Sequence, residues 1–508
     1  MKIDSTNQSS AAEDQRSLGR RGLLRFGSLL TSISGVTAIA AFGVTPAAAS
    51  DLSSTTQAIT DSSVETLTAT LGLKAWKIDP AVASLPPGQQ TAYFQKLFAD
   101  IAARGGTNVV EGGAQHFIVA RQNTTVTGLQ NMEVLFLLPA NTTFNVLDGF
   151  TVELDKSTTP NPSGLLMFQT GAMTDDGTAA LKGATIVTNN ETIGGGSIWA
   201  WGNRRPEQFN AATRNLVVDG VTVKDTRVAV TNARQSPRAP LANQDKNWRL
   251  TNGYVEKCNN RAIELSQLDG ALVANWVMRD VETAIHILGY SKNIRLRNID
   301  AVTRGSGLWI NYGCQDIDVD GLRLRVASGF DPSSGTLEFH SEPAPTSYTV
   351  SNIRFRNGRF GVSPTGTYKR SVTFMLPTGA VRMLWEDIKF KSCEFDGDVV
   401  IAPATNRMAG EIRNVRFEDC DFHGNIINLP TADYNAHDFL FVNCSFTSAS
   451  TLKINADNFR FINCNFFQAP MISATAKNTY VKNCVTPSTI VDNGSGSLLV
   501  GNDVLPPH

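Results

Sequence analysis

The sequence has 508 residues, with 45 basic and 46 acidic side chains and a formal net charge of −1. A chain of this length can bury a large core. The balanced charge excludes a global field that would favour nucleic acid, and we expect no membrane insertion of the mature chain.

Residues 1–49 have the features of an export signal. The segment 19–25 (GRRGLLR) resembles a twin-arginine signal in which Leu replaces the usual Phe. The stretch 29–44 is too weakly apolar to span a membrane, and Ala47–Ala49 offers a small-residue cleavage site. We therefore expect export of the folded chain by a bacterium, to the periplasm or the outside, with the mature protein beginning near Ser50. An uncleaved anchor is the alternative.

Residues 50–88 are interpreted as an N-terminal extension that opens with a loose Ser/Thr-rich stretch. Residues 89–106 place apolar side chains such as Leu97 and Ile101 at helical spacing and end in a glycine pair, so they are predicted to form a helix. We expect this helix to cap the β-structure that follows, because an uncapped end would expose unpaired strand edges.

Residues 107–490 contain a repeat. The segments 247–252 (NWRLTN), 270–275 (GALVAN) and 293–298 (NIRLRN) recur about every 23 residues, and a second apolar run follows each. Neither run has helical spacing, so each copy is predicted to be a strand, a turn and a strand. The aligned copies, about eleven in all, begin at Asn215, Asn247, Gly270, Asn293, Asp316, Asn352, Asp387, Asn414, Asp438, Asn458 and Asn478.

The flanks of this region are less regular. Residues 115–200 are rich in expected strands, among them 134–138 and 150–154, and are interpreted as the first copies. Residues 491–508 lose the pattern and are assigned to a C-terminal cap or tail.

A turn residue stands five places into each copy. The side chains there are Asn252, Asn275, Asn298, Asn357, Asn443, Asn463 and Asn483, with Gly220, Gly321, Ser392 and Asp419 in the other copies. These residue types tolerate left-handed backbone, and side chains stacked at ~4.8 Å can hydrogen-bond from copy to copy.

The pattern resembles the asparagine ladder of right-handed parallel β-helices in the pectin lyase-like superfamily, and it covers residues 90–490. The resemblance implies an all-β chain, a single-stranded right-handed parallel β-helix (β-solenoid) of about eleven or more rungs with an N-terminal capping helix. It leaves the reaction open, because the superfamily includes lyases, hydrolases, epimerases, esterases and phage tailspikes.

Five of the seven Cys residues directly follow the turn position: Cys393, Cys420, Cys444, Cys464 and Cys484. We interpret them as an interior ladder of small apolar side chains, because their spacing is not that of a zinc site. Disulfides between neighbouring copies stay open as an alternative.

In the superfamily, the first strand of each rung lies in the floor of a glycan cleft. Side chains alternate across a strand, so the apolar positions of these strands point inward and the others form two outward columns. The first column is Trp199, Ala229, Glu264, His286, Trp309, Glu338 and Thr373; the second is Trp201, Thr231, Ser266, Leu288, Asn311, His340 and Met375. Tryptophan beside acids suits a sugar ring. The alternative is that loops cover the face and the Trp side chains are packing.

The leading prediction is an exported enzyme that cleaves glycosidic bonds in a polysaccharide or oligosaccharide, by hydrolysis or transfer. The candidate catalytic residues are Glu338, Glu264, His286, His340, Asp331 and Glu342. Glu338 is predicted to be the general acid. Glu264 lies three rungs away, ~14 Å at the strand spacing, which is long for a catalytic pair, so Asp331 or Glu342 is the better partner. The candidate substrate-binding residues are Trp199, Trp201, Asn203, Arg204, Asn232, Arg234, Ser266, Trp309, Asn311 and Tyr312.

The second prediction is a polysaccharide lyase, which removes a proton from a uronate and needs the carboxylate neutralised. The neutralising candidates are Arg234, Arg261, Arg304 and Asn311, and the candidate bases are His286, His340 and Tyr312. No convincing cluster of acidic ligands is found, so no metal or cofactor is expected, except Ca²⁺ in the metal-dependent form of this reaction. The polygalacturonase motifs of the superfamily, such as Gly-His-Gly and Arg-Ile-Lys, are absent.

The third prediction, from another class, is a non-catalytic glycan-binding surface protein. In all three cases the partner is a polysaccharide or oligosaccharide. Parallel β-helices with flat exposed faces sometimes form trimers, so a homotrimer is kept as an alternative to the monomer.

Overall fold

A computed structural model describes residues 73–121, 133–156, 165–170, 177–189, 196–200, 214–232, 244–311, 313–330, 335–340, 347–367, 369–374, 383–401, 410–428 and 434–505. All of them belong to the second of the chain's two units, Gly72–His508. The expected export signal, residues 1–49, lies outside this description. Among the described residues, no helix has both the length and the apolar character needed to cross a bilayer.

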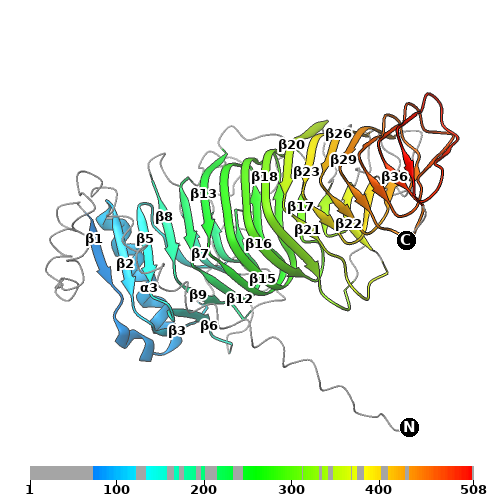
Figure 1. The fold of residues 1–508 in the computed structure, drawn as a ribbon. Coiled ribbons are helices and arrows are strands. Elements are labelled where there is room, and N and C mark those ends of the chain that lie inside the picture. Colours follow the sequence, from blue (N-terminus) through cyan, green and yellow to red (C-terminus); the bar gives the residue numbers. More distant parts are fainter. Residues whose placement is uncertain are drawn as a thin grey trace, which may run out of the picture. The chain divides into compact units, whose positions relative to one another are not determined.

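Every strand pairing in the described coil is parallel, and a complete turn of the chain contributes one strand to each of three parallel sheets (Figure 1). One rung shows the path: residues 245–251 lie in the second sheet, residues 254–258 in the third and residues 261–266 in the first. The chain then enters the second sheet again one rung further along. This confirms the parallel β-helix fold.

The first sheet contains β4 (Glu133–Leu138), β7 (Leu165–Thr170), β10 (Gly196–Ala200), the ends of β12 (Thr222–Thr231), β14 (Tyr254–Ser266) and β15 (Leu268–Leu288), and β17 (Leu308–Ile310), β19 (Leu337–Phe339), β22 (Arg370–Phe374), β25 (Asp398–Ile401) and β28 (Ile426–Asn428). A separate ladder further along contains β31 (Lys453–Ile454), β34 (Met471–Ile472) and β37 (Val491–Asp492).

The second sheet contains β1 (Lys74–Lys77), β2 (Asn108–Gly112), β5 (Thr142–Val146), β8 (Ala179–Lys182), β11 (Leu216–Asp219), β13 (Asp245–Thr251), the starts of β15, β16 (Lys292–Thr303) and β18 (Gln315–Val326), and β20 (Tyr348–Arg356), β23 (Met383–Lys391), β26 (Gly410–Glu418), β29 (Tyr434–Val442), β32 (Arg460–Ile462), β35 (Tyr480–Lys482) and β38 (Leu498–Val500).

The third sheet contains β3 (His116–Val119), β6 (Thr151–Leu154), β9 (Thr185–Val187), the starts of β12 and β14, the middle of β15, the ends of β16 and β18, and β21 (Arg359–Phe360), β24 (Glu394–Phe395), β27 (Asp421–Phe422), β30 (Ser445–Phe446), β33 (Asn465–Phe466), β36 (Val485–Thr486) and β39 (Asp503–Val504).

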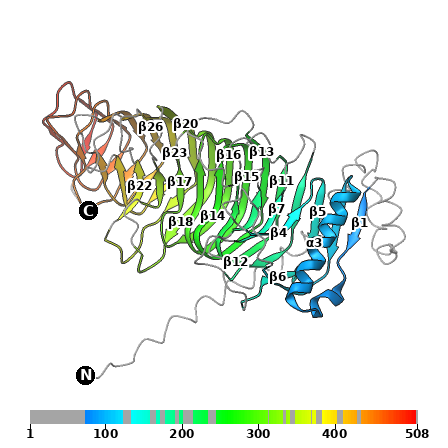
Figure 2. The ribbon, with the colours of Figure 1, turned by 180° about the vertical axis from the view of Figure 1, so that it is seen from behind.

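Helix α3 (Pro87–Arg104) is the predicted helix, and it packs against β3 and β4 at the end of the coil that carries β1 (Figure 2). Phe94 on its buried face lies 5.1 Å from Phe117 and 5.5 Å from Phe136, measured between ring centroids. The backbone at Gly105 has a φ of 60°, a conformation that glycine adopts without steric cost, and the helix ends there.

Regular structure extends beyond the range that the repeat pattern marks. Strand β1 and the short 3-10 helix η3 (Pro80–Ser84) lie in the range 50–88, which was interpreted as an extension. β1 pairs with β2. β39, which lies in the range assigned to a C-terminal cap or tail, pairs with β36. The terminal rungs lack the Asn-bearing repeat motif, so only their strand pairing reveals them.

At least two residues in each of the eleven aligned rungs take the left-handed conformation. All eleven predicted turn residues have positive φ, from 50° at Asn298 to 71° at Gly321, and so do all eleven aligned starts of the copies. Several side chains bond to the preceding rung: Asn275 Nδ2 donates to Asn252 Oδ1 at 2.9 Å, and Asn478 Nδ2 donates to Asn458 Oδ1 at 3.2 Å. The chain therefore has two ladders of left-handed residues, one at each end of the second-sheet strands.

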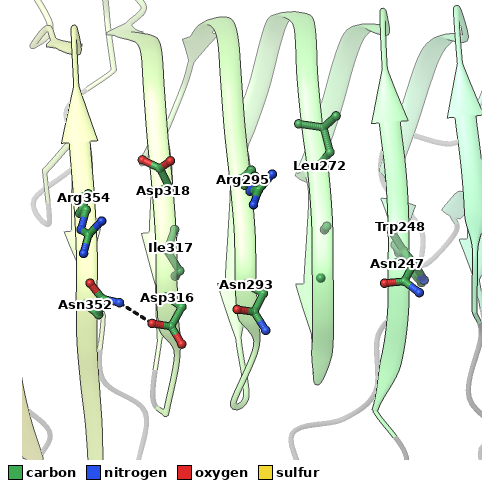
Figure 3. Close-up of a pocket in the computed structure, with 12 residues that line it drawn as sticks. Asn247, Trp248, Leu272, Asn293, Arg295, Asp316, Ile317, Asp318, Asn352 and Arg354 are labelled. Carbon is green, nitrogen blue, oxygen red and sulfur yellow. Dashed lines mark hydrogen bonds between the residues drawn. The ribbon is translucent and has the colours of Figure 1, made fainter.

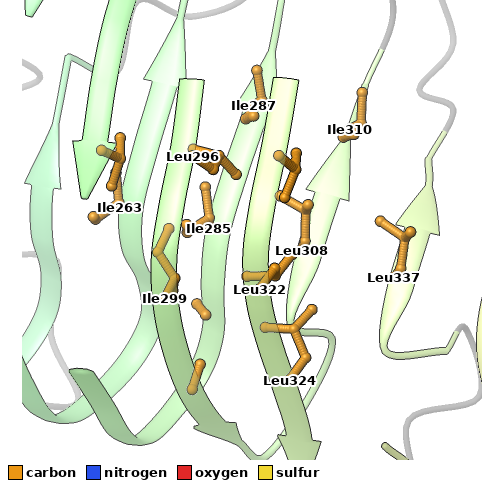
Figure 4. Packing of buried hydrophobic residues seen from close by; sticks show 14 of the residues in the cluster. Ile263, Ile285, Ile287, Leu296, Ile299, Leu308, Ile310, Leu322, Leu324 and Leu337 are labelled. Carbon is orange, nitrogen blue, oxygen red and sulfur yellow. The ribbon is translucent and has the colours of Figure 1, made fainter. Parts of the chain in front are cut away.

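The interior is filled by side chains that repeat from rung to rung. Ile263, Ile285 and Leu308 belong to neighbouring rungs and meet in the core (Figure 4). Further along the coil, aromatic rings stack in the same register, for example Phe417 on Phe441 with 4.9 Å between centroids and 2° between planes. Such stacking adds ~0.5–1.5 kcal/mol per pair to the burial itself.

The cysteine ladder lies in this interior. All seven Cys side chains are buried and none forms a disulfide. Outside the ladder, burial raises the pKa of the Cys258 thiol and of the Cys314 thiol to about 12, so both stay protonated. The interpretation of the regular cysteines as packing residues fits this arrangement.

Replacing Asn275 by Val should destabilise the coil more than replacing it by Gly. Asn275 has a φ of 58°, and a β-branched residue in that conformation costs about 1–2 kcal/mol. Both variants lose the hydrogen bond to Asn252, worth ~1 kcal/mol. We expect the midpoint of denaturant unfolding to fall furthest for Asn275→Val, and equal falls would contradict the backbone explanation.

Candidate active site

The first sheet aligns one column of chemically active side chains. Backbone pairing places Glu264 beside His286, His286 beside Trp309, Trp309 beside Glu338 and Glu338 beside Thr373. These five residues come from five successive rungs, so they form a line along the axis of the coil. The predicted order of the first column is confirmed over this part.

The predicted column is wrong at the preceding rung. Thr231, not Ala229, pairs with Glu264, and Trp199 pairs with Thr231. The end of β12 is therefore displaced by two positions from the alignment made from the sequence, and the pairing of β12 with β14 is irregular by one residue between Thr226 and Val228.

The column is more buried than a solvent-exposed cleft floor. Glu264 is 7%, Glu338 is 1% and His286 is 0% exposed. Trp309 and His340 are half-buried. The alternative that other residues cover this face therefore fits Glu264, His286 and Glu338.

At one end of the column, Arg261 neutralises a buried carboxylate. Arg261 Nη1 donates to Glu264 Oε2 at 2.5 Å, and the same oxygen lies 3.9 Å from His286 Nδ1. The guanidinium also reaches across His286 to Trp309, with its central carbon 5.8 Å from the ring centroid. Arg261 is partly exposed, with 27% of its side chain accessible, so a positive group stands at the surface above the column.

His286 is held in its neutral form. Burial first, and then the neighbouring Arg261 and His340, keep its pKa well below the ordinary value. Neither ring nitrogen has a hydrogen-bond partner among the described residues. His286 packs edge-on against Trp309, with 5.2 Å between the ring centroids.

At the other end of the column, Glu338 binds a second histidine. Its Oε1 accepts a hydrogen bond from His340 Nδ1, and its Oε2 accepts one from Ser306 Oγ at 3.2 Å. The His340 ring stacks on Trp309, with 5.0 Å between centroids and 7° between planes. In the neutral ring, an Nδ1 proton donated to Glu338 would leave the lone pair of His340 on Nε2.

These contacts change the interpretation of Trp309. It was predicted to be a stacking platform for sugar. In the structure His340 covers one face of its ring, His286 meets its edge and Arg261 lies within cation–π distance. The half-buried Trp309 therefore holds the two histidines and Arg261 in a fixed arrangement.

Three further predicted binding residues are fully buried. Asn232 donates from Nδ2 to Asp245 Oδ2 at 2.8 Å, and its Oδ1 accepts from the backbone N–H of Ser266 at 2.8 Å. Asn232, Ser266 and Asn311 are each 0% exposed. The hydrogen bond between Asn232 and Ser266 joins neighbouring rungs, so both residues have a structural role in the described part of the chain.

The remaining predicted site residues lie outside the description. They are Trp201, Asn203, Arg204, Arg234, Tyr312, Asp331 and Glu342, and for Trp199 only the backbone is described. The pairing of Glu338 with Asp331 or Glu342 stays a prediction. Glu264 and Glu338 are separated by three rungs, ~14 Å, and therefore do not form a two-carboxylate pair of the hydrolase kind.

Two residues that sequence reasoning did not assign belong to the site. Ser306 binds Glu338, and it stands in the Gly305–Gly307 turn that leads into β17. The Thr373 hydroxyl, fully buried beside Glu338, has no partner within the described part of the chain. The alignment of first strands contained Thr373, whereas Ser306 precedes its strand and gave no periodic signal.

Among the described residues, one group of side chains has the spacing of metal ligands: Glu394, Asp396 and His423. It lies on the third sheet, away from the column. Arg359 already forms ion pairs with Glu394 at 3.4 Å and Asp396 at 3.3 Å, so its guanidinium group balances the negative charge of these two carboxylates.

No protein-family model matches the sequence, and no curated protein matches it significantly. Several solved structures resemble the coil. The A-module of the mannuronan C-5 epimerase AlgE6 of Azotobacter vinelandii is 11% identical with a TM-score of 0.48, over 82% of this chain and 96% of that one. A tailspike protein of the Escherichia coli bacteriophage HK620, in complex with a pentasaccharide, is 12% identical with a TM-score of 0.45, over 85% and 79%.

A third similar structure, the surface adhesin PfbA of Streptococcus pneumoniae, is 11% identical with a TM-score of 0.39, over 85% of this chain and 93% of that one. The three resemble this chain in their coiled strands. At such identities they carry no argument about its reaction.

The neutral, buried His286 should make the protein less stable in acid. Its ordinary pKa is 6.5, and the folded-state pKa lies well below it. Below pH 6.5 the unfolded chain therefore binds a proton that the folded chain does not. The free energy of unfolding consequently decreases as the pH is lowered, by at most about 1.4 kcal/mol per pH unit for this group.

The measurement is denaturant unfolding at several pH values for the wild type and His286→Gln. The variant should lose less stability than the wild type between pH 7 and 5. His116→Gln, which removes an exposed histidine near the other end of the coil, should behave as the wild type does. An unchanged slope in His286→Gln would refute the assignment.

Proposed function

We propose that the protein is an exported enzyme that cleaves an acidic polysaccharide by β-elimination at the first sheet. The observation that supports this best is the arrangement around Trp309. Arg261 approaches the ring from the β14 side and His340 from the β19 side, and both are partly exposed. A cation and an oriented base beside one another are what removal of a proton next to a carboxylate requires.

In this proposal Arg261 binds the carboxylate of a uronate residue and stabilises the negative charge that develops during the reaction. His340 Nε2 removes the proton from C5. The electron pair forms the C4–C5 double bond, the C4–oxygen bond breaks, and the departing oxygen takes up a proton. The products are a new chain end and an unsaturated uronate.

Glu338 acts through His340. Its carboxylate holds the Nδ1 proton and thereby keeps the lone pair of the ring on Nε2, and Ser306 holds the other carboxylate oxygen. Glu264 positions Arg261. His286, neutral and enclosed, separates Glu264 from Trp309 without adding a charge.

Arg261 supplies the positive charge that Ca²⁺ would supply in a metal-dependent lyase. We therefore propose that the reaction proceeds without a divalent cation. The addition of a chelator should leave turnover unchanged, and loss of turnover that Ca²⁺ restores would contradict this part.

Hydrolysis is the second candidate, because Glu338 is almost completely buried and its strand lies between Asp331 and Glu342 in the sequence. It needs one of these carboxylates as partner within ~10 Å. A glycan-binding protein without activity is the third candidate.

A panel of polysaccharides, assayed in parallel for new reducing ends and for the ultraviolet absorbance of unsaturated uronates, separates these candidates. We expect both signals on a uronate polymer and neither on a neutral glucan. Reducing ends without absorbance would favour hydrolysis, and binding without either signal would favour a binding protein.

His340→Gln should lower kcat by ~10²–10⁴-fold, the usual contribution of a general base. Arg261→Gln should act on kcat and KM together, because the cation binds the substrate carboxylate and stabilises the developing charge. The matched control is His116→Gln, which removes a histidine paired with Glu153 far from the column. Full activity of His340→Gln would reject the proposed base.

A further inference from the structure

The outward face of the second sheet carries a row of cations that the proposed reaction does not use. Strand pairing aligns nine successive positions, and six of them are basic, two are apolar and one is acidic. In order along the coil they are Arg249, Leu272, Arg295, Asp318, Arg354, Lys389, Arg416, Leu440 and Arg460. The chain as a whole has a net charge of −1, so this row is a local concentration of positive charge.

Such a row costs stability. Arg354, Lys389 and Arg416 stand directly beside one another on neighbouring strands, ~4.8 Å apart in the backbone, and like charges in that position repel. Glu418 partly compensates the last two, since it forms ion pairs with Lys389 at 2.8 Å and with Arg416. Arg354 has no ion pair within the described part of the chain.

Asp318 does not neutralise the positive charge of the neighbouring Arg295 and Arg354. Asp318 stands between Arg295 and Arg354 in the row, but Arg297 binds it at 2.5 Å and Arg356 binds it at 3.2 Å. Arg295 and Arg354 are exposed and form no ion pair among the described residues. Two uncompensated guanidinium groups therefore remain, two rungs or ~10 Å apart along the axis.

These two arginines line a shallow groove of about 540 Å³ on the face of the sheet (Figure 3). Its other walls include the polar ladder residues Asn293 and Asn352, the carboxylates of Asp316 and Asp318, and the apolar Leu272. Figure 3 shows Arg295 and Arg354 on either side of the strand that carries Asp318. The groove runs across the strands, in the direction in which the row of cations continues.

We propose that this face binds a linear anionic polysaccharide along the axis of the coil, with Arg295 and Arg354 as the main contacts. A polymer with one negative charge per sugar presents its charges to successive rungs and relieves the repulsion within the row. Binding here needs no catalysis. That the bound chain belongs to the same class of polymer as the substrate rests on the proposed function.

The test uses the full mature protein with His340→Gln, so that the polymer is not consumed. Alginate is the probe, neutral dextran the uncharged comparison and double-stranded DNA the competing polyanion, with affinity measured by titration calorimetry. Replacing both Arg295 and Arg354 by Gln should weaken alginate binding about tenfold. Added salt should weaken alginate binding more in the protein with the unaltered row than in the double variant.

Arg323→Gln is the matched control. Arg323 is also an exposed arginine on β18, but its strand segment lies in the third sheet. This variant should bind alginate as strongly as its parent. Equal binding by the double variant and its parent would overturn the proposal, as would binding of DNA as tight as that of alginate, since the face would then be a general polyanion surface.

Turnover separates this proposal from the proposed function. In the otherwise wild-type enzyme the double variant should raise KM for long uronate polymers and leave kcat unchanged. If alginate bound in an arginine-dependent way and the otherwise wild-type enzyme formed no unsaturated product, the proposed lyase would be refuted. The proposed binding face would still be supported.

Discussion

The structure depends on a backbone constraint that recurs at both ends of the second-sheet strand in each of the eleven aligned rungs. At each end of a second-sheet strand the chain must bend sharply while its strands stay in register with the rungs on both sides. Left-handed residues make these bends, and Asn, Asp and Gly take that conformation at the lowest cost. The Asn side chains also bond to the rung before, so each bend is held by its neighbour.

The same constraint creates the candidate active site. Because each rung repeats the path of the last, residues about 23 positions apart in the chain become neighbours in space. Glu264, His286, Trp309 and Glu338 are far apart in sequence and adjacent in the first sheet. No single rung contains a reactive site. A cation, an aromatic ring and a base come together only because four successive rungs each contribute one or two side chains.

The two outward faces use their charges differently. On the first sheet, each buried carboxylate binds a partly exposed basic side chain, as in the pairs Arg261–Glu264 and His340–Glu338, so that each group is held in one orientation. On the second sheet, charges of one sign are exposed, and Arg295 and Arg354 stay uncompensated. The first arrangement suits chemistry at one sugar, and the second suits attraction of a long polymer.

The sequence by itself determined the repeat, the helix at its start, the left-handed turns and the order of the column from Glu264 to Thr373, because periodicity and turn chemistry are local properties of the chain. It did not reveal the register of β12, in which Thr231 pairs with Glu264, nor the strands β1 and β39 at the ends. Only the tertiary structure decided that Trp309 is enclosed by two histidines and Arg261, and that the carboxylates are buried. Those facts depend on how large side chains from different rungs share one space, and no single rung contains that information.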